Sequence, residues 1–170
     1  VPGLDAGDEV TEDMLHFRLF DDVKQVREGM YDEYIQFVMM FEESVRGLKA
    51  KAPVEYRGLR IGTVMKVPMR MPRPEEDFSA KKIPVLVRIE LGRVYENLPS
   101  SQLQKFKKKL EEEFTKGLRG TLKTGNLLTG ALYIDTDFYP DEEPYVPSKF
   151  EDYDVFPCLL YTSPSPRDDR

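Results

Sequence analysis

The stretch from Gly117 to Phe138 reads GLRGTLKTGNLLTGALYIDTDF and predicts two strands joined by a short loop. In its second half, the side chains that alternate along one face are Leu132, Ile134, Thr136 and Phe138. This alternation has the period of a strand that buries one of its sides. We therefore interpret the rest of the chain outward from this hairpin.

The loop of this hairpin has an unusual composition. Gly125 and Gly130 bracket the segment Asn126–Thr129, in which Leu127 and Leu128 are adjacent. Turns between strands normally carry Gly, Asn, Asp or Ser, which tolerate the turn dihedrals and favour water. Two neighbouring residues of an extended loop cannot both point inward, so we expect at least one leucine to face solvent or a partner. The alternative is that both leucines plug the end of a small barrel.

The overall composition indicates a globular chain that is not built for nucleic acid. The chain has 170 residues, 40% of them hydrophobic, with ten phenylalanines and nine tyrosines, which suffices for one domain with a buried core. Its net charge of −6 argues against nucleic-acid binding, since affinity for phosphate chains comes from clustered Lys and Arg. No apolar run approaches the roughly 20 residues that span a bilayer.

The single cysteine and the single histidine exclude several kinds of site. Cys158 cannot form an internal disulfide framework, and His16 has no second His or Cys with which to bind zinc. We therefore expect no metal and no cofactor. The chain opens at Val1 without a signal peptide, so we interpret it as an internal fragment whose targeting segment lies upstream. Residues 158–170 look like the translation of a transposase-type sequencing adapter, and we expect them not to be native.

Short apolar segments separated by glycines predict a mainly β domain. Besides the hairpin, the segments that we interpret as strands or short extended pieces are 34–41, 45–48, 53–58, 59–67 and 83–91. Gly47, Gly58 and Gly62 recur among them at a spacing that suits tight corners or bulges of a barrel. Residues 69–80, which are rich in proline and acidic side chains, predict an exposed loop.

One segment switches from the period of a strand to that of a helix. Leu103, Phe106, Leu110 and Phe114 form an apolar stripe at spacings of three and four, which predicts an amphipathic helix over about 100–116. Ser101 and Gln104 have the spacing of a capping box at its start, and Gly117 suits its end. Its run of lysines is followed by glutamates, so we interpret the charged side as a solvated face rather than a nucleic-acid patch.

The sequence contains no arrangement of residues typical of an active site. Ser44, Glu55, Asp135 and Asp137 could each take part in catalysis, but no histidine lies near a serine and no spacing of nucleophile and base is present. Asp135 and Asp137 are two apart on a strand, which fits its solvent face, and a metal there would need further ligands. We therefore expect that the protein is not an enzyme.

Three blocks of sequence together resemble the MCE (mammalian cell entry) domain. They are Phe41–Leu48 (FEESVRGL), Ala52–Val64 (APVEYRGLRIGTV) and Gly117–Gly130, and they occur in the same order as in that family. The blocks resemble the tandem-MCE proteins of the paraquat-inducible protein B type, and the first block is most similar to the last MCE module of such a protein. On this resemblance, residues 34–140 form the MCE domain.

The resemblance also assigns the flanking segments. Alternation predicts a short strand at Leu15–Phe20, and the spacing of Val23 and Val26 predicts a helix over 21–30. On the resemblance, residues 1–33 become the end of a preceding module and a connector, with Leu15–Phe20 as the exit of that module. Residues 141–157 become a linker toward C-terminal helices that this chain lacks. At Lys51 the family usually has Gly, and a left-handed turn costs another residue about 1 kcal/mol, so we expect a different local turn.

The resemblance implies a small MCE-type β-barrel of about seven strands, with one inserted amphipathic helix and extended termini. Such domains form hexameric rings in which one loop of each subunit lines a central pore. That loop matches Asn126–Thr129, which makes Leu127 and Leu128 candidates for the pore lining, while Gly47, Gly58, Gly62, Gly125 and Gly130 would form structural turns.

The function that the resemblance implies is transport of phospholipid or another lipid between the inner and outer membranes of a double-membraned bacterium. The protein would be periplasmic, attached to the inner membrane through a segment outside this chain, with an inner-membrane subunit as partner and without nucleic acid. The alternative is a structural ring that only spaces other domains.

Overall fold

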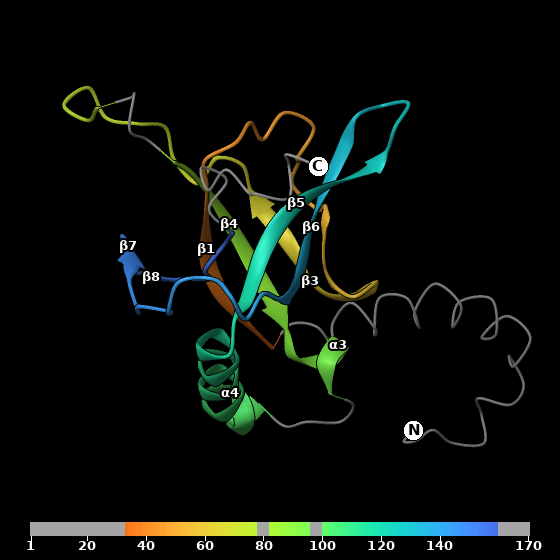
Figure 1. Ribbon diagram of the computed structural model, residues 1–170, viewed down its shortest axis with the longest axis vertical. Coiled ribbons are helices and arrows are strands. Elements are labelled where there is room, and N and C mark those ends of the chain that lie inside the picture. Colours follow the sequence, from red (N-terminus) through yellow and green to blue (C-terminus); the bar gives the residue numbers. More distant parts are fainter. Residues whose placement is uncertain (1–32, 78–81, 96–99, 160–170) are drawn as a thin grey trace, which may run out of the picture.

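The computed structural model describes residues 33–77, 82–95 and 100–159, which form one curved sheet with helices at one end (Figure 1). The eight strands are arranged in the order β5-β6-β2-β3-β4-β1-β8-β7. Their bounds are Tyr34–Phe41 (β1), Pro53–Tyr56 (β2), Leu59–Lys66 (β3), Ile83–Glu90 (β4), Leu118–Asn126 (β5), Ala131–Phe138 (β6), Lys149–Phe150 (β7) and Tyr153–Val155 (β8). The expectation of a mainly β fold is confirmed, although the segment 45–48 forms no strand.

The core lies between β1, β4 and the strands that flank them. β1 pairs with β4 along its whole length, from Tyr34 opposite Glu90 to Phe41 opposite Ile83. Phe37, Met39, Val85 and Val87 are fully buried, which accounts for the apolar residues on these strands. This pair therefore forms the apolar wall against which the other strands and the helix pack.

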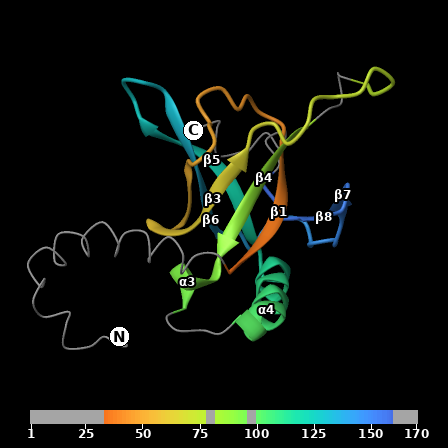
Figure 2. The ribbon, with the colours of Figure 1, turned by 180° about the vertical axis from the view of Figure 1, so that it is seen from behind.

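The amphipathic helix α4 (Leu103–Thr115) packs across one end of the sheet, next to the one-turn helix α3 (Leu91–Val94) (Figure 2). A short 3-10 turn, η2 (Ser100–Gln102), precedes α4. Phe106, Leu110 and Phe114 are buried, as the apolar stripe predicted. The expected capping box is wrong, because α4 begins after Gln102 without a side-chain cap.

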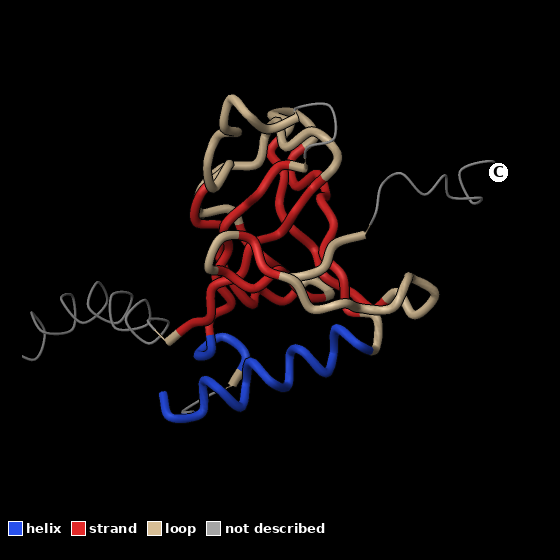
Figure 3. The backbone as a smooth tube through the Cα atoms, turned by 90° about the vertical axis from the view of Figure 1, so that its left-hand side faces the viewer, coloured by secondary structure: helices blue, strands red, loops and turns tan. Residues whose placement is uncertain are grey.

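One edge of the sheet, β5, meets the residues that follow β8, which closes the sheet into a small barrel (Figure 3). Gly120 of β5 forms a parallel bridge with Cys158, just beyond β8. The Gly120 N–H donates to the carbonyl of Pro157 at 2.9 Å, and the Leu159 N–H donates to the Gly120 carbonyl at 3.0 Å. The barrel thus contains a seam between β5 and residues that follow β8.

The segment 141–157 differs from the linker that the sequence led us to expect. Its second half contributes β7 and β8, and β8 pairs with β1 in parallel. Phe156 is fully buried, with its ring centroid 4.7 Å from that of Phe114 and 5.6 Å from that of Phe37. Buried Arg119 donates a hydrogen bond to the carbonyl of Glu143 at 2.8 Å. This bond attaches the first half of the segment 141–157 to β5.

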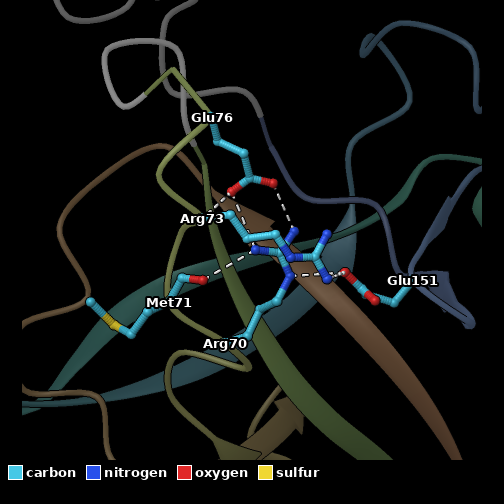
Figure 4. Close-up of polar contacts among 5 residues, drawn as sticks. All are labelled: Arg70, Met71, Arg73, Glu76 and Glu151. Atoms are coloured by element: carbon cyan, nitrogen blue, oxygen red, sulfur yellow. Dashed lines mark hydrogen bonds and ion pairs between the residues drawn. The ribbon is translucent and has the colours of Figure 1, made fainter.

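The connection between β3 and β4 leaves the barrel as an arm that is tied to the β7–β8 turn (Figure 4). Arg70 is the centre of this contact. Its Nε donates to Glu151 at 2.8 Å, its Nη2 donates to Glu76 at 2.9 Å, and its guanidinium lies 4.9 Å from the centroid of the Phe150 ring. The side chain of Met71 remains 71% exposed, in agreement with the predicted exposed loop.

Two backbone details depart from the expectations. Gly62 and Gly125 lie inside β3 and β5, each beside a register shift, and not in turns between strands; for Gly62 this agrees with a bulge, which was one of its two expected roles. Lys51 has φ 78°, so the left-handed turn is formed there without glycine, and its N–H donates to the carbonyl of Val64 at 2.7 Å. The expected change of turn at Lys51 is therefore wrong.

The strand expected at Leu15–Phe20, the helix expected over 21–30 and most of the adapter-like segment 158–170 lie outside the described residues. Within the described ranges, the helices are too short and too polar to cross a bilayer.

Candidate functional site

The β5–β6 hairpin projects beyond the barrel at the end opposite α4 (Figures 1 and 2). Its strands pair from Leu118 opposite Phe138 to Asn126 opposite Ala131. The register shifts between Thr124 and Asn126, where Gly125 stands. The predicted pair of strands and the connecting loop are thus present, and the loop lies at the free tip.

The polar groups of this loop are satisfied within the loop itself. Asn126 Oδ1 accepts hydrogen bonds from the N–H groups of Leu128 at 2.9 Å and Thr129 at 3.2 Å. The Gly130 N–H donates to the Asn126 carbonyl at 2.8 Å, and the Ala131 N–H donates to Thr129 Oγ1 at 3.3 Å. An Asn side chain that caps the following amides fixes a turn locally. The loop therefore holds its shape without help from the leucine side chains.

Both leucines of this loop are exposed to solvent. Leu127 is 91% exposed and Leu128 is 97% exposed. Burying a leucine side chain is worth about 1.5–3 kcal/mol, which this chain alone does not gain at either position. The expectation that at least one leucine points outward is confirmed, and the alternative that both plug the barrel is wrong for the single chain. We call Leu127 and Leu128 the leucine tip.

The part of the hairpin next to its loop is held by the turn that contains Gly47. The Leu132 N–H donates to the Gly47 carbonyl at 2.9 Å. Gly47 has φ 92°, and a Cβ atom at this position would lie 2.2 Å from the carbonyl oxygen of Gly130. Only glycine allows this close approach. The 42–52 connection thus supports the hairpin just behind the leucine tip.

This contact predicts that Gly47→Ala destabilises the domain strongly. Left-handed backbone strain costs about 1 kcal/mol and the forced contact about 1–3 kcal/mol more, so we expect a loss of about 2–4 kcal/mol in the free energy of unfolding. Gly58→Ala is the matched control, because Gly58 has φ 87° but nothing within 4 Å of the added Cβ. Chemical denaturation measures both variants. Equal losses would show that the contact with Gly130 carries no energy.

The acidic residues of the hairpin form ion pairs with lysine and arginine. Lys123 Nζ lies 3.2 Å from Asp135 Oδ2, and the hydrogen bond to Asp135 raises the pKa of Lys123. Arg57 Nε lies 2.9 Å from Asp137 Oδ1. The pKa of Asp137 is lowered first by the Phe138 N–H and then by Arg57. Asp135 is only 8% exposed, so its expected place on a solvent face is wrong.

The other two residues considered for catalysis lie apart from each other. Ser44 Oγ accepts a hydrogen bond from the Arg46 N–H at 3.1 Å, while Glu55 stands beside Asp135 in the pairing of β2 with β6. Among the described residues, no group of three or more His, Cys, Asp or Glu side chains is placed to hold a metal ion.

The structure is thus a closed β-barrel with one projecting hairpin, and its candidate functional site is the exposed leucine tip of that hairpin, which can contact a partner. Residues 33–139 match the family described as MlaD protein, and the chain belongs to this family. Domains of this MCE type are non-catalytic components of transport systems. The chain is also similar to a chain of the Acinetobacter MlaFEDB complex in its ATP-bound Vtrans1 conformation, with 14% identity and a TM-score of 0.40 over 89% of this chain and 92% of that one.

Proposed function

We propose that this chain is the pore-forming module of a lipid transport channel. The observation that carries the proposal is the leucine tip, whose two side chains are 91% and 97% exposed on a loop closed by its own hydrogen bonds. Membership of the MlaD family supports lipid transport as the setting. An exposed apolar pair on a fixed loop is what a passing acyl chain requires, since the loop need not rearrange to receive it.

In the proposed assembly, copies of the chain form a hexameric ring and each contributes its leucine tip to the central opening. An apolar collar of this kind opposes the passage of ions, because stripping water from a charge is costly. Each leucine covered by a lipid tail gains at most about 1.5–3 kcal/mol, and neighbouring positions around the collar are alike. A lipid tail can then move along the collar without a position at which its binding free energy is much more favourable than at the next.

We further propose that the chain corresponds to the last MCE module of a tandem-MCE protein of the paraquat-inducible protein B type. It would act in the periplasm, attached to the inner membrane through residues outside this chain and working with an inner-membrane subunit. Its cargo would be phospholipid moving between the inner and outer membranes. Residues 1–33 would connect it to a preceding module. Residues 158–170 would be foreign to the natural protein, so that the contacts of Cys158 and Leu159 with Gly120 would belong to this chain alone, whereas the bond from the Gly120 N–H to Pro157 would be native.

Native mass spectrometry of the detergent-solubilised full-length protein tests the proposal. We expect a hexamer that retains phospholipid, with the lipid identified after its release in the gas phase. A hexamer that never carries lipid would support the structural ring instead. A protein that stays monomeric at every concentration would contradict both the ring and the pore.

A further inference from the structure

An apolar groove lies beside α3 and α4, at the end of the barrel opposite the projecting hairpin (Figures 1 and 2). It has a volume of about 240 Å³. Most of its lining is aromatic or aliphatic, namely Tyr56, Ile61, Val94, Tyr95, Phe106 and Phe138. We call it the α4 groove.

The walls of the α4 groove are firmly packed but not covered. The rings of Tyr95 and Phe106 pack edge to face at 5.7 Å between centroids, as do those of Tyr56 and Phe138 at 6.0 Å. Val94 nevertheless remains 37% exposed and Tyr95 41% exposed, so no segment within 33–77, 82–95 and 100–159 covers these two side chains completely. Large apolar side chains that stay exposed together on a small domain mark a contact surface.

The chain enters the barrel next to this groove. Glu33 is the first described residue, and its carbonyl accepts a hydrogen bond from the Leu91 N–H at 2.8 Å. The Leu91 carbonyl in turn accepts one from the Tyr95 N–H at 2.9 Å. Since one turn of α-helix rises about 5.4 Å, Glu33 lies only about one helical turn from the wall of the groove. Residues 1–32 therefore join the barrel at the rim of the groove.

The segment just before Glu33 has one apolar side. Val23, Val26 and Met30 are spaced by three and four residues, which places them on one side of the helix predicted over 21–30. Two residues separate Met30 from Glu33, and three steps of extended chain span at most about 10 Å, so Met30 stays close to the groove. Such a short tether gives the segment a high effective concentration there. A helix this short is marginal in water, so burial of its apolar side would decide whether it forms.

Charge favours the same contact. Residues 1–32 contain nine Asp or Glu against three Lys or Arg, which accounts for the whole net charge of −6. Lys109 lines the α4 groove, and Lys105 lies one turn earlier on the same helix in an adjoining hollow. Glu113 also lines the groove, but its carboxylate is paired with Lys109 at 3.1 Å and with Lys116 at 3.4 Å. An acidic segment therefore suits a rim on which lysines outnumber carboxylates.

We propose that the α4 groove is the docking site of residues 21–30 of the same chain, which lay Val23, Val26 and Met30 into it as one side of a short helix. The entry point, the tether length, the apolar side and the charge all favour this occupant over a separate molecule. The docked segment would set the direction in which the chain leaves the barrel. A module that precedes this domain would then be held in a fixed orientation instead of moving freely. The proposal requires neither lipid nor a ring.

Disulfide formation between introduced cysteines tests the contact in the 170-residue chain. In a Cys158→Ser background, Val26→Cys is combined with Val94→Cys, and oxidised glutathione is added at a low protein concentration. A disulfide requires Cα atoms about 4.4–6.8 Å apart, so a segment that lies in the groove brings the two thiols together. We expect an intramolecular disulfide, identified by mass spectrometry of the digested chain.

Gln25→Cys combined with Val94→Cys is the matched control. Gln25 has nearly the same tether as Val26, but successive helical residues are about 100° apart, which turns Gln25 away from the apolar side. We expect its disulfide to form at least about tenfold more slowly. Equal rates for the two pairs would overturn the proposal, because a loose tether would bring both positions to Val94 alike. Disulfides formed only between two chains would also overturn it and would assign the groove to a second copy.

Hydrogen exchange measures the docking without introduced cysteines. The amides of residues 21–30 should be protected at least about tenfold in the unsubstituted chain, and Val26→Asp should remove this protection by placing a carboxylate in the groove. Gln25→Asp adds the same charge on the other side of the helix and should retain most of the protection. No protection in the unsubstituted chain, or an equal loss in both variants, would contradict docking.

The outcomes are separable from those for the leucine tip. Unchanged exchange of the β1 and β4 amides verifies that the barrel is folded in each variant. Leu127→Asp combined with Leu128→Asp should leave the protection of residues 21–30 unchanged. Failure of the docking proposal would therefore leave the pore proposal standing, and failure of the pore would not remove the protection measured here.

Discussion

Phe156→Ala is expected to lower the free energy of unfolding by about 3–5 kcal/mol, the usual cost of removing a buried aromatic side chain. Phe156 is fully buried and its ring packs edge to face against Phe37 and Phe114. Domains are stable by only about 5–15 kcal/mol, so the loss is a large share of the total. Equilibrium denaturation followed by circular dichroism measures it.

Phe150→Ala is the control for this prediction. Phe150 belongs to the same C-terminal segment, but it is half-buried in the two-residue strand β7. There the Arg70 guanidinium lies 4.9 Å from the centroid of its ring, at cation–π distance. We expect it to cost only about 1 kcal/mol. A loss below about 1 kcal/mol for Phe156→Ala would mean that the segment after residue 141 is the linker that its composition suggests rather than a part of the barrel.

Replacing both leucines of the tip by aspartate is expected to reduce lipid transfer by at least tenfold without unfolding the domain. Both side chains are almost fully exposed, so their replacement removes no packing within the chain. In an assembled pore, the carboxylates would draw water into the collar and present charge to an apolar tail, which is costly. Transfer of fluorescent phospholipid between donor and acceptor vesicles by the full-length protein measures the loss.

Met71→Asp provides the matched substitution for the leucine pair. Met71 is 71% exposed, lies on the arm between β3 and β4, and takes no part in the proposed pore. It should leave transfer unchanged. If the double leucine variant also assembles and transfers lipid at the normal rate, the ring acts only as a spacer and the conduit is excluded.

The strands and the helix whose apolar residues repeat at a regular spacing were mostly predicted from the sequence. β1 is apolar on both faces, β4 and β6 repeat apolar residues at every second position, and α4 repeats its apolar stripe over three turns, so the local patterns agree with where these elements are buried. The adjacent leucines also stood out by themselves, because two large apolar residues in a hairpin loop conflict with the usual composition of turns.

What the sequence missed depends on contacts between distant segments. β7 and β8 contain two and three residues, too few to show a period, and they lie in a stretch rich in proline and acidic residues. The burial of Phe156 depends on pairing with β1, more than a hundred residues earlier. Lys51 takes a left-handed conformation despite its Cβ atom, held by the carbonyl of Val64.

The contacts of Glu90 with Arg88, Arg93 and Thr63 could not be predicted for the same reason. Arg60 and Arg88 look like ordinary solvent-facing residues of two strands, and Glu90 looks like a third. Only the pairing of β3 with β4 and the turn of α3 bring them together around one buried carboxylate. A group of contacts assembled from three elements leaves no signal in the spacing of any one of them.

Site-specific photocrosslinking tests the central claim most directly. A photoreactive amino acid is placed at position 128 or, as a control, at position 71 of the full-length protein in its native membrane, and covalent lipid adducts are detected by mass spectrometry. The pore predicts phospholipid adducts at position 128 and none at position 71. No adduct at position 128, or equal labelling at both positions, would contradict it.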